Sequence, residues 1–509
     1  MMVKSISNHV AITLKQLLAN YLATEFLPDT DVLGLTLDSR CVEEGFVFVA
    51  LEGKFEHGLA YAETALNQGA AAILYDANCD QYCQQILSKL MPRSVCVPIR
   101  DLQNKLGEMA NQFYAKPSEQ MFVTGITGTD GKTSVSHFIA QAMNNAHGAA
   151  AVIGTLGNGA INTLTESMHT TPDVIRLHAI LADLKQQDIG NVSIEVSSHG
   201  LDQKRSANVD FNVAVLTNFT RDHLDYHGDI NSYKQAKKKL FAENAEKTFV
   251  LNIDDDLGAE LYSEYGKKDN IWLYGLTESK ARQSHLYVYA SHIRNETNGI
   301  SFMLHSSMGE SDVNIQLIGE FNVYNALACF SVLLENNINF NIAIRYIEKL
   351  STVPGRMELI VNAQKPSVVI DYAHTPEALN QALINVRKHT NGKVICVFGC
   401  GGDRDAGKRP LMGEVAESLS DLIFITNDNP RTESPENIID DIKQGLSNPV
   451  QLIVEMDREK AIQQAISLAT KNDLILIAGK GHEQYQIIKN QKNAFSDKDI
   501  ALQALEVKT

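Results

Sequence analysis

The sequence lacks any long hydrophobic run. No stretch reaches the roughly 18 consecutive apolar residues that a membrane-spanning helix needs. The first twenty residues contain Lys4 and Lys15 but no continuous apolar core of the kind found in a secretory signal peptide. We therefore expect no membrane span and no signal peptide, and we expect a cytoplasmic protein.

Cysteine is scarce, and its spacing does not indicate a metal site. The chain has 7 cysteines, an odd number for a long chain. Cys79 and Cys83 are four positions apart, and so are Cys396 and Cys400. Neither pair has the CxxC spacing typical of zinc sites, so we interpret these residues as reduced thiols.

Positive charge is also in short supply. Lysine and arginine number 45 against 61 aspartates and glutamates, which gives a net charge of -16. This balance argues against a general nucleic-acid-binding protein. It fits a cytosolic enzyme, although an anionic substrate would then need a local positive site.

The chain has the length and composition of a multidomain enzyme. Its 509 residues correspond to about three domains of ~150 residues each. A hydrophobic content of 44% and a charged content of 21% are ordinary for a soluble globular protein. We expect an α/β fold with a small N-terminal α/β domain at 1–102, a central P-loop ATPase domain at 103–352 and a C-terminal doubly wound, Rossmann-like domain at 353–509.

The clearest motif is the glycine-rich segment 125–134. A strand-like run precedes it, and apolar residues recur at helical spacing over 135–143, which is the context a phosphate-binding loop requires. Glycines let backbone N–H groups face an anion, and the helix N-terminus adds a positive dipole end. Lys132 would supply charge to the β/γ-phosphates, and Thr133 a hydroxyl to Mg²⁺. The spacing departs from the standard pattern by one residue, so the core of the loop is 128–134; an ordinary glycine turn is the less favoured interpretation.

Polar residues follow two expected strands of the central domain. Glu195 ends an apolar run, where an unpaired carboxylate would be costly, so a metal or an ion-pair partner is favoured. Four metal-ligating side chains then crowd into six residues: Asp222, His223, Asp225 and His227. With a triphosphate already implied, this cluster favours a Mg²⁺ site, while a solvated loop with helix-capping carboxylates is the alternative. The lysine run 237–239 is typical of a solvated face, and the residues alone do not single out one lysine.

Expected strands and helices alternate through the C-terminal domain, which favours a doubly wound sheet with ligands bound at the carboxyl ends of its strands. Side chains of both charges would gather there: Arg404, Arg409, Asp428, Arg431 and Glu483. Both signs of charge in one crevice suit a zwitterionic ligand. In the N-terminal domain the polar segment 38–40 precedes a buried strand expected at 45–51, and a turn with a helix-style cap is its favoured interpretation.

Together these segments resemble the Mur ligase family, which builds the peptide of bacterial cell-wall precursors. The match covers all three expected domains. The segment Asp428-Asn429-Pro430-Arg431 resembles the form that adds meso-2,6-diaminopimelate to UDP-N-acetylmuramoyl-L-alanyl-D-glutamate, whereas lysine-adding relatives usually lack the arginine. The most specific segments are 36–40, 125–134, 195–200, 221–228, 355–358, 371–376, 401–405 and 428–431.

The resemblance implies a reaction and its cofactors. ATP would phosphorylate the free carboxylate of the D-glutamyl unit, and the amine of diaminopimelate would attack the acyl phosphate through a tetrahedral intermediate. A carboxylate is a poor electrophile until a phosphoryl leaving group activates it, so the protein's task is positioning and charge neutralisation. The implied cofactors are ATP and Mg²⁺, and the implied partners are the two small-molecule substrates, without nucleic acid. We expect a monomer.

The resemblance also implies roles for particular residues. The catalytic group is Lys132, Glu195, His223 and Lys237, and the metal would be held by Thr133, Glu195, His223 and Lys237. ATP would be bound by Gly128, Thr129, Asp130, Gly131, Lys132, Thr133, Ser134, Asn322, Arg356 and Asp371. The UDP-linked substrate would be bound by Leu37, Ser39, Lys54, Phe55, Glu56, His169, Thr170, Thr171, Ser197, Gln203 and Arg205. Diaminopimelate would be bound by Arg404, Asp428, Asn429, Pro430, Arg431, Gly479 and Glu483.

Three positions carry further implications of the resemblance. Lys237 matches the lysine that carries a carbamate in this family, a change that converts a cation repelling Mg²⁺ into a carboxylate that binds it. Asp130 stands where many relatives have asparagine, and its extra negative charge near phosphate is unfavourable unless it is paired or turned away. His169 stands where close relatives often have asparagine, so Thr170 and Thr171 match the family's substrate contacts more closely than His169 does.

Two alternative functions stay open. A lysine-adding ligase is disfavoured by Arg431, because the distal carboxylate of diaminopimelate suits a guanidinium while the ammonium of lysine would be repelled. A nucleotide-switch ATPase is permitted by the phosphate-binding loop, but it would not need an amino-acid pocket. Because nucleotide and acceptor sites are expected on different domains, we expect domain closure, with a hinge near 352–355.

Overall fold

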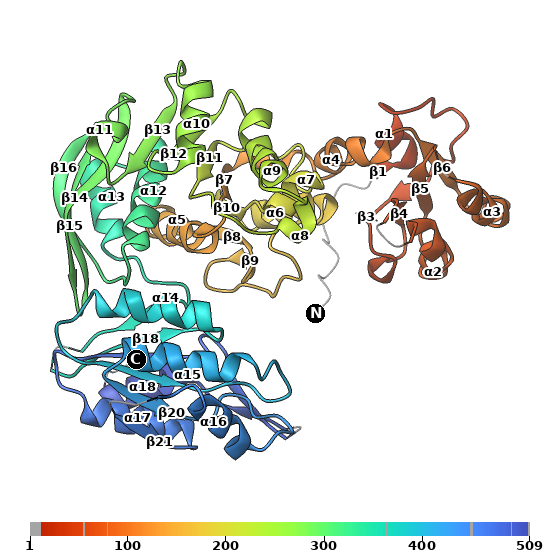
Figure 1. Ribbon diagram of the computed structural model, residues 1–509. Coiled ribbons are helices and arrows are strands. Elements are labelled where there is room, and N and C mark those ends of the chain that lie inside the picture. Colours follow the sequence, from red (N-terminus) through yellow and green to blue (C-terminus); the bar gives the residue numbers. More distant parts are fainter. Residues whose placement is uncertain are drawn as a thin grey trace. The chain divides into compact units, whose positions relative to one another are not determined.

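The computed structural model describes residues 12–53, 56–78, 80–362, 364–447, 451–489 and 491–506 (Figure 1). The chain forms two compact units. The first comprises Met1–Leu251 and Asp255–Ile271, and the second comprises Asn252–Asp254 and Trp272–Thr509. Both units mix helices with largely parallel sheets, which confirms the expected α/β class.

The N-terminal part of the first unit is a four-stranded parallel sheet with the order β3-β4-β5-β6. Successive side chains of β4 alternate between the two faces, so Val47 and Val49 pack on one side and Phe48 on the other. Helices α1 and α4 cover the first face, and α2 and α3 cover the second (Figure 1). The elements are β1 (Ile12–Thr13), α1 (Leu14–Leu18), β2 (Asp31–Val32), β3 (Gly34–Thr36), η1 (Ser39–Cys41), β4 (Phe46–Ala50), η2 (Gly58–Tyr61), α2 (Ala62–Asn67), β5 (Ala72–Asp76), α3 (Gln81–Leu90), β6 (Cys96–Ile99) and α4 (Leu102–Phe113).

The remainder of the first unit is built around β7. This strand lies between β11 and β10 in a run of sheet strands with the order β12-β11-β7-β10-β8-β9. The strands from β12 to β8 are mutually parallel where their pairing is described, and β9 is antiparallel to β8. The elements are η3 (Pro117–Gln120), β7 (Phe122–Thr127), α5 (Lys132–His147), β8 (Ala151–Gly154), β9 (Gly157–Ala160), α6 (Val174–Gln186), β10 (Asn191–Glu195), α7 (Ser198–Asp202), β11 (Val213–Leu216), α8 (Leu224–His227), α9 (Ile230–Glu243), β12 (Thr248–Asn252) and α10 (Asp256–Tyr265).

The second unit begins with a hairpin-rich segment. Strand β14 is parallel to β13 and antiparallel to β15, and β15 is antiparallel to β16. The elements are β13 (Ile271–Gly275), α11 (Glu278–Ala281), β14 (Leu286–Glu296), β15 (Gly299–Ser306), β16 (Gly309–Ile315), α12 (Phe321–Glu335) and α13 (Phe340–Ile347).

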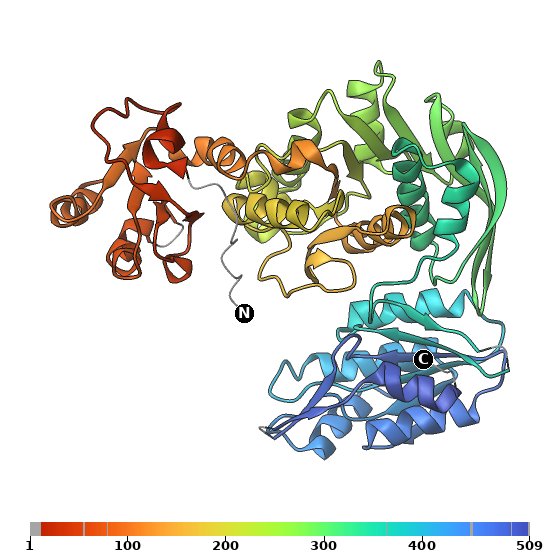
Figure 2. The ribbon, with the colours of Figure 1, turned by 180° about the vertical axis from the view of Figure 1, so that it is seen from behind.

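The C-terminal part of the second unit is a six-stranded sheet with the order β17-β18-β22-β19-β20-β21. All described pairs are parallel except β17 with β18. Helices α14, α15 and α16 pack on one face and α17 and α18 on the other (Figures 1 and 2), which confirms the doubly wound arrangement. The elements are β17 (Glu358–Ile360), β18 (Ser367–Asp371), α14 (Pro376–Arg387), β19 (Val394–Phe398), α15 (Lys408–Leu419), β20 (Leu422–Ile425), α16 (Pro435–Lys443), β21 (Leu452–Val454), α17 (Arg458–Leu468), β22 (Leu474–Ala478), β23 (Tyr485–Ile488), β24 (Gln491–Ala494) and α18 (Asp497–Leu505).

Membrane-spanning helices and cysteine pairing can be assessed for the described residues. No described helix is long and apolar enough to cross a membrane. The described cysteines are all free: Cys83, Cys329, Cys396 and Cys400 are buried, Cys96 is partly buried and Cys41 is exposed. Burial raises the pKa of the Cys396 and Cys400 thiols to about 12, so both are unreactive at neutral pH.

Candidate functional site

The glycine-rich loop lies between β7 and α5, as the sequence predicted. Helix α5 begins at Lys132 because Gly131 has a φ of 80°, a left-handed turn that glycine adopts without strain. Gly128 leaves no room for a side chain, since a Cβ atom there would meet the Thr217 hydroxyl. Lys132 Nζ folds back onto its own loop and donates to the carbonyls of Gly128 (2.9 Å) and Thr129 (2.7 Å). Two backbone carbonyls of the loop thus hold the Lys132 ammonium group.

Asp130 does not place a second charge inside the loop. Its side chain is exposed, while its backbone N–H donates to Asn218 Oδ1 at 2.8 Å and its carbonyl accepts from Thr217 Oγ1 at 2.6 Å. The loop is therefore closed by backbone contacts that an asparagine would make equally well.

Glu195 is the buried centre of the first unit's polar cluster. Its side chain ends β10, has no solvent exposure and accepts hydrogen bonds from Thr133 Oγ1 (2.8 Å), Thr155 Oγ1 (3.1 Å) and the Thr155 N–H (3.0 Å). Burial raises the pKa of this carboxyl, and the Thr133 and Thr155 hydrogen bonds together with the Lys132 charge oppose that rise. The structure thus joins the loop threonine and the strand-end carboxylate that the sequence predicted separately; Thr155 was missed, although it directly follows β8.

A second set of predicted residues adjoins Glu195. Thr171 is buried, and its hydroxyl donates to the Glu195 carbonyl (2.8 Å) and accepts from the Ser197 N–H (3.0 Å). The Thr170 and Thr155 hydroxyls are 3.0 Å apart. Arg205 extends the group by donating to the Thr171 carbonyl (2.8 Å) and to Gln203 Oε1 (2.7 Å from Nη2). His169 is exposed, and its described hydrogen bonds are those of its backbone to Ser167.

The acid- and histidine-rich segment 222–227 is more open than Glu195. His223 is 45% exposed and contacts Asp222 Oδ2 through Nε2 at 3.3 Å. His227 instead lies 3.0 Å from the Ser198 hydroxyl, and Asp225 is exposed. These side chains therefore do not converge as one cluster, and within the described part of the chain no three histidine, cysteine, aspartate or glutamate side chains group in a way that could hold a metal ion.

Lys237 is the buried member of the lysine run. It is 1% exposed, and its Nζ donates to the Gly128 carbonyl at 2.6 Å. Burial, followed by the nearby Lys132 charge, lowers the pKa of this amine from 10.5 to about 6. Lys238 and Lys239 instead form ion pairs with acidic side chains, Glu260 and Asp202 respectively. Only the first lysine of the run therefore presents an amine to the phosphate-binding loop.

The residues around the loop fit a magnesium ion in part. Mg²⁺ prefers oxygen ligands and keeps several waters and phosphate oxygens in its shell. Thr133 and Glu195 supply a hydroxyl and a buried carboxylate that already touch each other. Lys237 supplies an oxygen only if it is modified, and His223 would have to turn from Asp222.

The predicted substrate-side residues of the N-terminal sheet are only partly described. Ser39 is buried and Leu37 half-buried beside Asp38, whose carboxylate accepts from the Arg40 N–H at 2.9 Å and caps η1. This confirms the predicted turn with a helix-style cap. Glu56 accepts from the Tyr61 hydroxyl at 2.8 Å, while Lys54 and Phe55 lie outside the described residues.

The nucleotide residues predicted in the second unit have defined local contacts. Asn322, buried at the start of α12, donates to the Ile318 carbonyl at 2.8 Å. Asp371 ends β18 and accepts from the Met357 and Ala373 N–H groups at 2.7 and 2.8 Å, although burial raises the pKa of its carboxyl. Arg356 is exposed and its guanidinium lies 5.2 Å from the centre of the Tyr372 ring.

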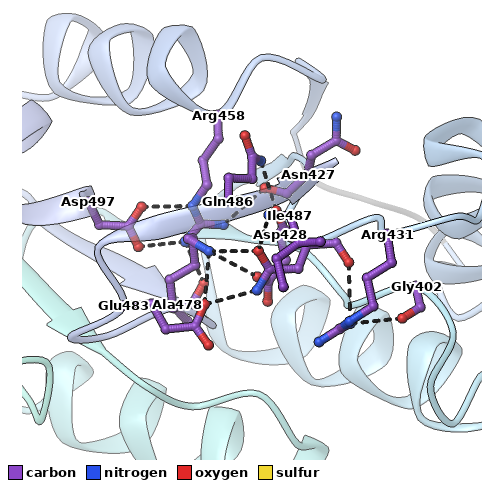
Figure 3. Close-up of polar contacts among 12 residues, drawn as sticks. Gly402, Asn427, Asp428, Arg431, Arg458, Ala478, Glu483, Gln486, Ile487 and Asp497 are labelled. Carbon is purple, nitrogen blue, oxygen red and sulfur yellow. Dashed lines mark hydrogen bonds and ion pairs between the residues drawn. The ribbon is translucent and has the colours of Figure 1, made fainter. Parts of the chain in front are cut away.

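The predicted acceptor residues gather at the carboxyl ends of β20 and β22 (Figure 3). Asn429 Nδ2 donates to Glu483 Oε2 at 2.9 Å. Asp428 is buried next to Gly479, and burial raises the pKa of its carboxyl. Arg431 has a φ of 52°, and its Nη1 donates to the carbonyls of Gly402 (2.8 Å) and Asn429 (3.4 Å). Pro430 is buried between these residues and Arg404 is exposed.

Arg409 corrects one sequence interpretation. It was expected in the acceptor crevice, but its buried guanidinium pairs with Glu433 at 2.7 Å and with Asp441 at 2.9 Å. Its charge is thus used within the fold. Lys480, which contacts Glu483 and Asn429, was not predicted, and neither was the buried Arg458–Asp497 pair beside them. Their only sequence signal is charged residues at or near strand ends.

Comparisons with known proteins agree across the chain. A family model described as the Mur ligase middle domain matches residues 126–333, and one described as the Mur ligase, glutamate ligase domain matches 355–481. A UDP-N-acetylmuramoyl-L-alanyl-D-glutamate–2,6-diaminopimelate ligase of Coxiella burnetii is 43% identical over 478 residues, covering 94% of this chain and 96% of that protein. The protein of the same name from Vibrio vulnificus is 40% identical and covers 97% of this chain and 99% of its own.

Solved structures give the same picture. A structure of UDP-N-acetylmuramoyl-L-alanyl-D-glutamate–2,6-diaminopimelate ligase superposes with a TM-score of 0.77 at 33% identity, covering 97% of this chain and 99% of its own. A MurF ligase from Thermotoga maritima, solved in complex with ADP, has a TM-score of 0.56 at 18% identity and covers 93% and 97% of the two chains. The second likeness shows the fold alone.

Proposed function

The chain belongs to the Mur ligase family, and from this premise we propose that it is an ATP-dependent ligase that joins meso-2,6-diaminopimelate to UDP-N-acetylmuramoyl-L-alanyl-D-glutamate through an acyl phosphate. The observation that carries the proposal is the 43% identity to a ligase of that name over 94% of the chain. The mixed-charge cluster around Asp428, Glu483 and Arg431 supports an amino-acid acceptor.

In this proposal the phosphate-binding loop holds ATP. Lys132 would exchange its two loop carbonyls for phosphate oxygens, and the backbone N–H groups at the start of α5 would face the same anion. Thr133 and Glu195 would hold Mg²⁺ together with His223, and this ion would supply charge neutralisation as the phosphoryl group moves. Asn322, Arg356 and Asp371 are the further residues that we propose for nucleotide contact.

Lys237 would complete the metal site as a carbamate. A neutral amine is the form that attacks carbon dioxide, and the lowered pKa of Lys237 makes that form dominant at pH 7. The Nζ lone pair forms an N–C bond, one proton leaves to solvent, and the product carries a single negative charge. That charge would lie near the Lys132 ammonium group and so be stabilised by it, since both side chains contact the Gly128 carbonyl.

The proposed UDP-substrate site combines two sources. The residues next to Glu195 would place the D-glutamyl carboxylate beside the phosphate-binding loop, since Thr171 hydrogen-bonds both the Glu195 carbonyl and the Ser197 N–H. Arg205 would supply positive charge there. Leu37, Ser39 and Glu56, with Lys54 and Phe55, would contact the uridine side. We assign His169 a weaker part because its side chain is exposed.

The proposed acceptor site recognises both ends of a zwitterion. Among the described residues, the hydrogen bonds of the Arg431 guanidinium use Nη1, which leaves Nη2 and Nε for a carboxylate. Asp428 and Glu483 would receive the neighbouring ammonium group. Lysine has no distal carboxylate for Arg431 to bind, so we propose that diaminopimelate is preferred over lysine.

We also propose that the chain is a cytoplasmic monomer with three functional domains at 1–102, 103–352 and 353–509. Its proposed substrates are charged, and one of them is linked to a nucleotide. Such substrates and ATP suit an enzyme of the cytoplasm. Light scattering coupled to size-exclusion chromatography tests the oligomeric state, and a mass near twice 56.1 kDa would overturn it.

Phosphate release from ATP and Mg²⁺ tests the proposed function. The purified chain is incubated with UDP-N-acetylmuramoyl-L-Ala-D-Glu and a panel of amino acids. Release that requires both the UDP substrate and diaminopimelate is the expected result. Release with lysine in place of diaminopimelate would keep the ligase reaction and overturn the specificity. Release without any amino acid would instead favour a nucleotide-switch ATPase.

A further inference from the structure

Lys480 is a fully buried lysine at the end of a central strand. It follows β22 and Gly479 and has no solvent exposure. Lysine is almost never fully buried unless it is paired, because the charged form loses its hydration. The contacts of its ammonium group therefore indicate the role of this buried charge.

The Lys480 ammonium group joins residues from two strand ends. Its Nζ lies 3.0 Å from Glu483 Oε2, 3.1 Å from Asn429 Oδ1 and 3.6 Å from Asp428 Oδ1. Asp428 and Asn429 follow β20, whereas Glu483 follows β22. One buried cation thus touches all three of these side chains, and each belongs to the proposed acceptor site.

Buried charged groups of both signs meet around Lys480. The neighbouring Arg458 pairs with Asp497 through two bonds of 2.7 Å, and neither side chain is exposed. Lys480 contacts two carboxylates, Asp428 and Glu483, and the charges of Arg458 and Lys480 both oppose the rise that burial causes in the pKa of Asp428. Asp428 Oδ1 is buried and has no hydrogen-bond partner among the described residues. A buried carboxylate oxygen without a donor is costly, so Asp428 Oδ1 is the atom of this cluster best suited to accept a hydrogen bond from an acceptor ammonium group.

We propose that Lys480 is a positioning residue that holds Asp428, Asn429 and Glu483 as a receptor for a single ammonium group of the acceptor amino acid. This inference rests on the proposed function. Lys480 needs no contact with the acceptor itself. It holds the two carboxylates in position through its contacts with both, so that they can accept hydrogen bonds from one ammonium group of the acceptor. The adjacent Arg431 then receives the carboxylate of the same amino-acid end.

Steady-state kinetics of Lys480→Met tests this role. Methionine is similar in length to the lysine stem and lacks the charge, so the carboxylates would lose their fixed orientation and repel each other. We expect the KM for diaminopimelate to rise by roughly thirtyfold, as for loss of one partner in a buried charge pair. The KM values for ATP and for the UDP substrate should stay within about twofold of wild type, because Lys480 contacts none of the residues proposed for them.

Lys492→Met is the matched control. Lys492 is an exposed lysine in the same part of the chain, with its Nζ 3.7 Å from the centre of the Tyr485 ring. The same substitution there should leave all three KM values unchanged. A double variant, Lys480→Met with Glu483→Gln, removes one charge of each sign. If the two residues acted independently, the fold-increases in KM for diaminopimelate of the two single variants would multiply. We expect the increase in the double variant to be smaller than that product.

Two results would overturn the role of Lys480. One is an unchanged KM for diaminopimelate, and the other is a fall in kcat with all three KM values preserved, which is what general loosening of the fold would give. If Lys480→Met does not fold by circular dichroism, Lys480→Gln keeps a donor without the charge, and the same criteria apply. A wild-type chain that ligates no diaminopimelate would contradict the proposed function instead, and this outcome is seen before any variant is made.

Discussion

At the scale of single residues, Lys237 links burial, chemistry and stability. In the unfolded chain this amine has its ordinary pKa of 10.5, whereas in the folded chain its pKa is about 6. Between those values the unfolded state binds more protons, so the free energy of unfolding rises with pH across this window. The folded protein carries this cost at neutral pH in order to present a neutral amine.

We predict that Lys237→Met stabilises the protein while abolishing ligation. At pH 7 the free energy of unfolding of the variant should exceed that of wild type by about 1 kcal/mol or more. In wild type, Lys237 should make this free energy rise by up to about 1.4 kcal/mol per pH unit above pH 6, and the variant should lack this contribution. Denaturant titrations from pH 6.5 to 8.5, in buffer freed of carbon dioxide, measure both. Lys239→Met is the control, since Lys239 is half-exposed and paired with Asp202. Parallel pH slopes for wild type and Lys237→Met would contradict the assignment.

Arg431 carries the second residue-scale prediction. Arg431→Ala should lower kcat/KM for diaminopimelate by an amount equivalent to roughly 2–4 kcal/mol, because a charged hydrogen-bonding partner of the distal carboxylate is lost. Part of the change will reflect the φ of 52° at this position, which alanine tolerates poorly. Lys492→Ala, at an exposed cation outside the proposed acceptor site, provides the comparison. Unchanged kinetics with Arg431→Ala would remove this residue from the acceptor site.

At the scale of elements, the sequence predicted the regular parts of the fold well. Apolar runs predicted the buried strands of the three larger sheets to within a few residues, and the phosphate-binding loop was placed between the correct strand and helix. Helix α5 starts three residues before the apolar pattern predicted, because Gly131 turns the chain at once into the helix. Local signals sufficed here because strands and helices are specified by neighbouring residues.

The tight packing of Gly128 gives a prediction for that loop. A Cβ at Gly128 would meet the Thr217 hydroxyl at a φ of 152°, so Gly128→Ala must displace the loop carbonyl that receives both Lys132 and Lys237. ATP affinity, measured by calorimetry, should fall by more than about tenfold. Gly148→Ala, at the other end of α5, meets no atom within 4 Å and should leave ATP binding unchanged. Equal effects of the two variants would show that the loop is not the nucleotide site.

At the scale of the whole molecule, the sequence could not reveal which charges pair. Arg409 finds Glu433 and Asp441, which are 24 and 32 residues away along the chain. Lys480 reaches Asn429 across 51 residues. Such partners are set by the order of strands in the sheet, which residue patterns do not encode, so one arginine was wrongly placed in the acceptor crevice and one lysine was overlooked.

The expected hinge near 352–355 belongs to this scale as well. Gly355 has a φ of 69°, and a Cβ there would meet the backbone of Gly481 and His482, next to the acceptor cluster. We therefore expect Gly355→Ala to lower kcat by about tenfold and to raise the KM for diaminopimelate, with a smaller change in the KM for ATP. Steady-state kinetics with each substrate varied in turn measures this. Equal losses for ATP and diaminopimelate would argue against a hinge role.

The uneven exposure of the thiols has a practical consequence. Among the described cysteines Cys41 alone is exposed, and it lies in η1 two residues after Ser39, on the proposed uridine side. The buried thiols of the C-terminal sheet are protected from alkylation by their raised pKa values. Once Cys79 has been replaced by serine, a maleimide dye on Cys41 would give a fluorescence signal for substrate docking, with no cysteine engineered into the chain.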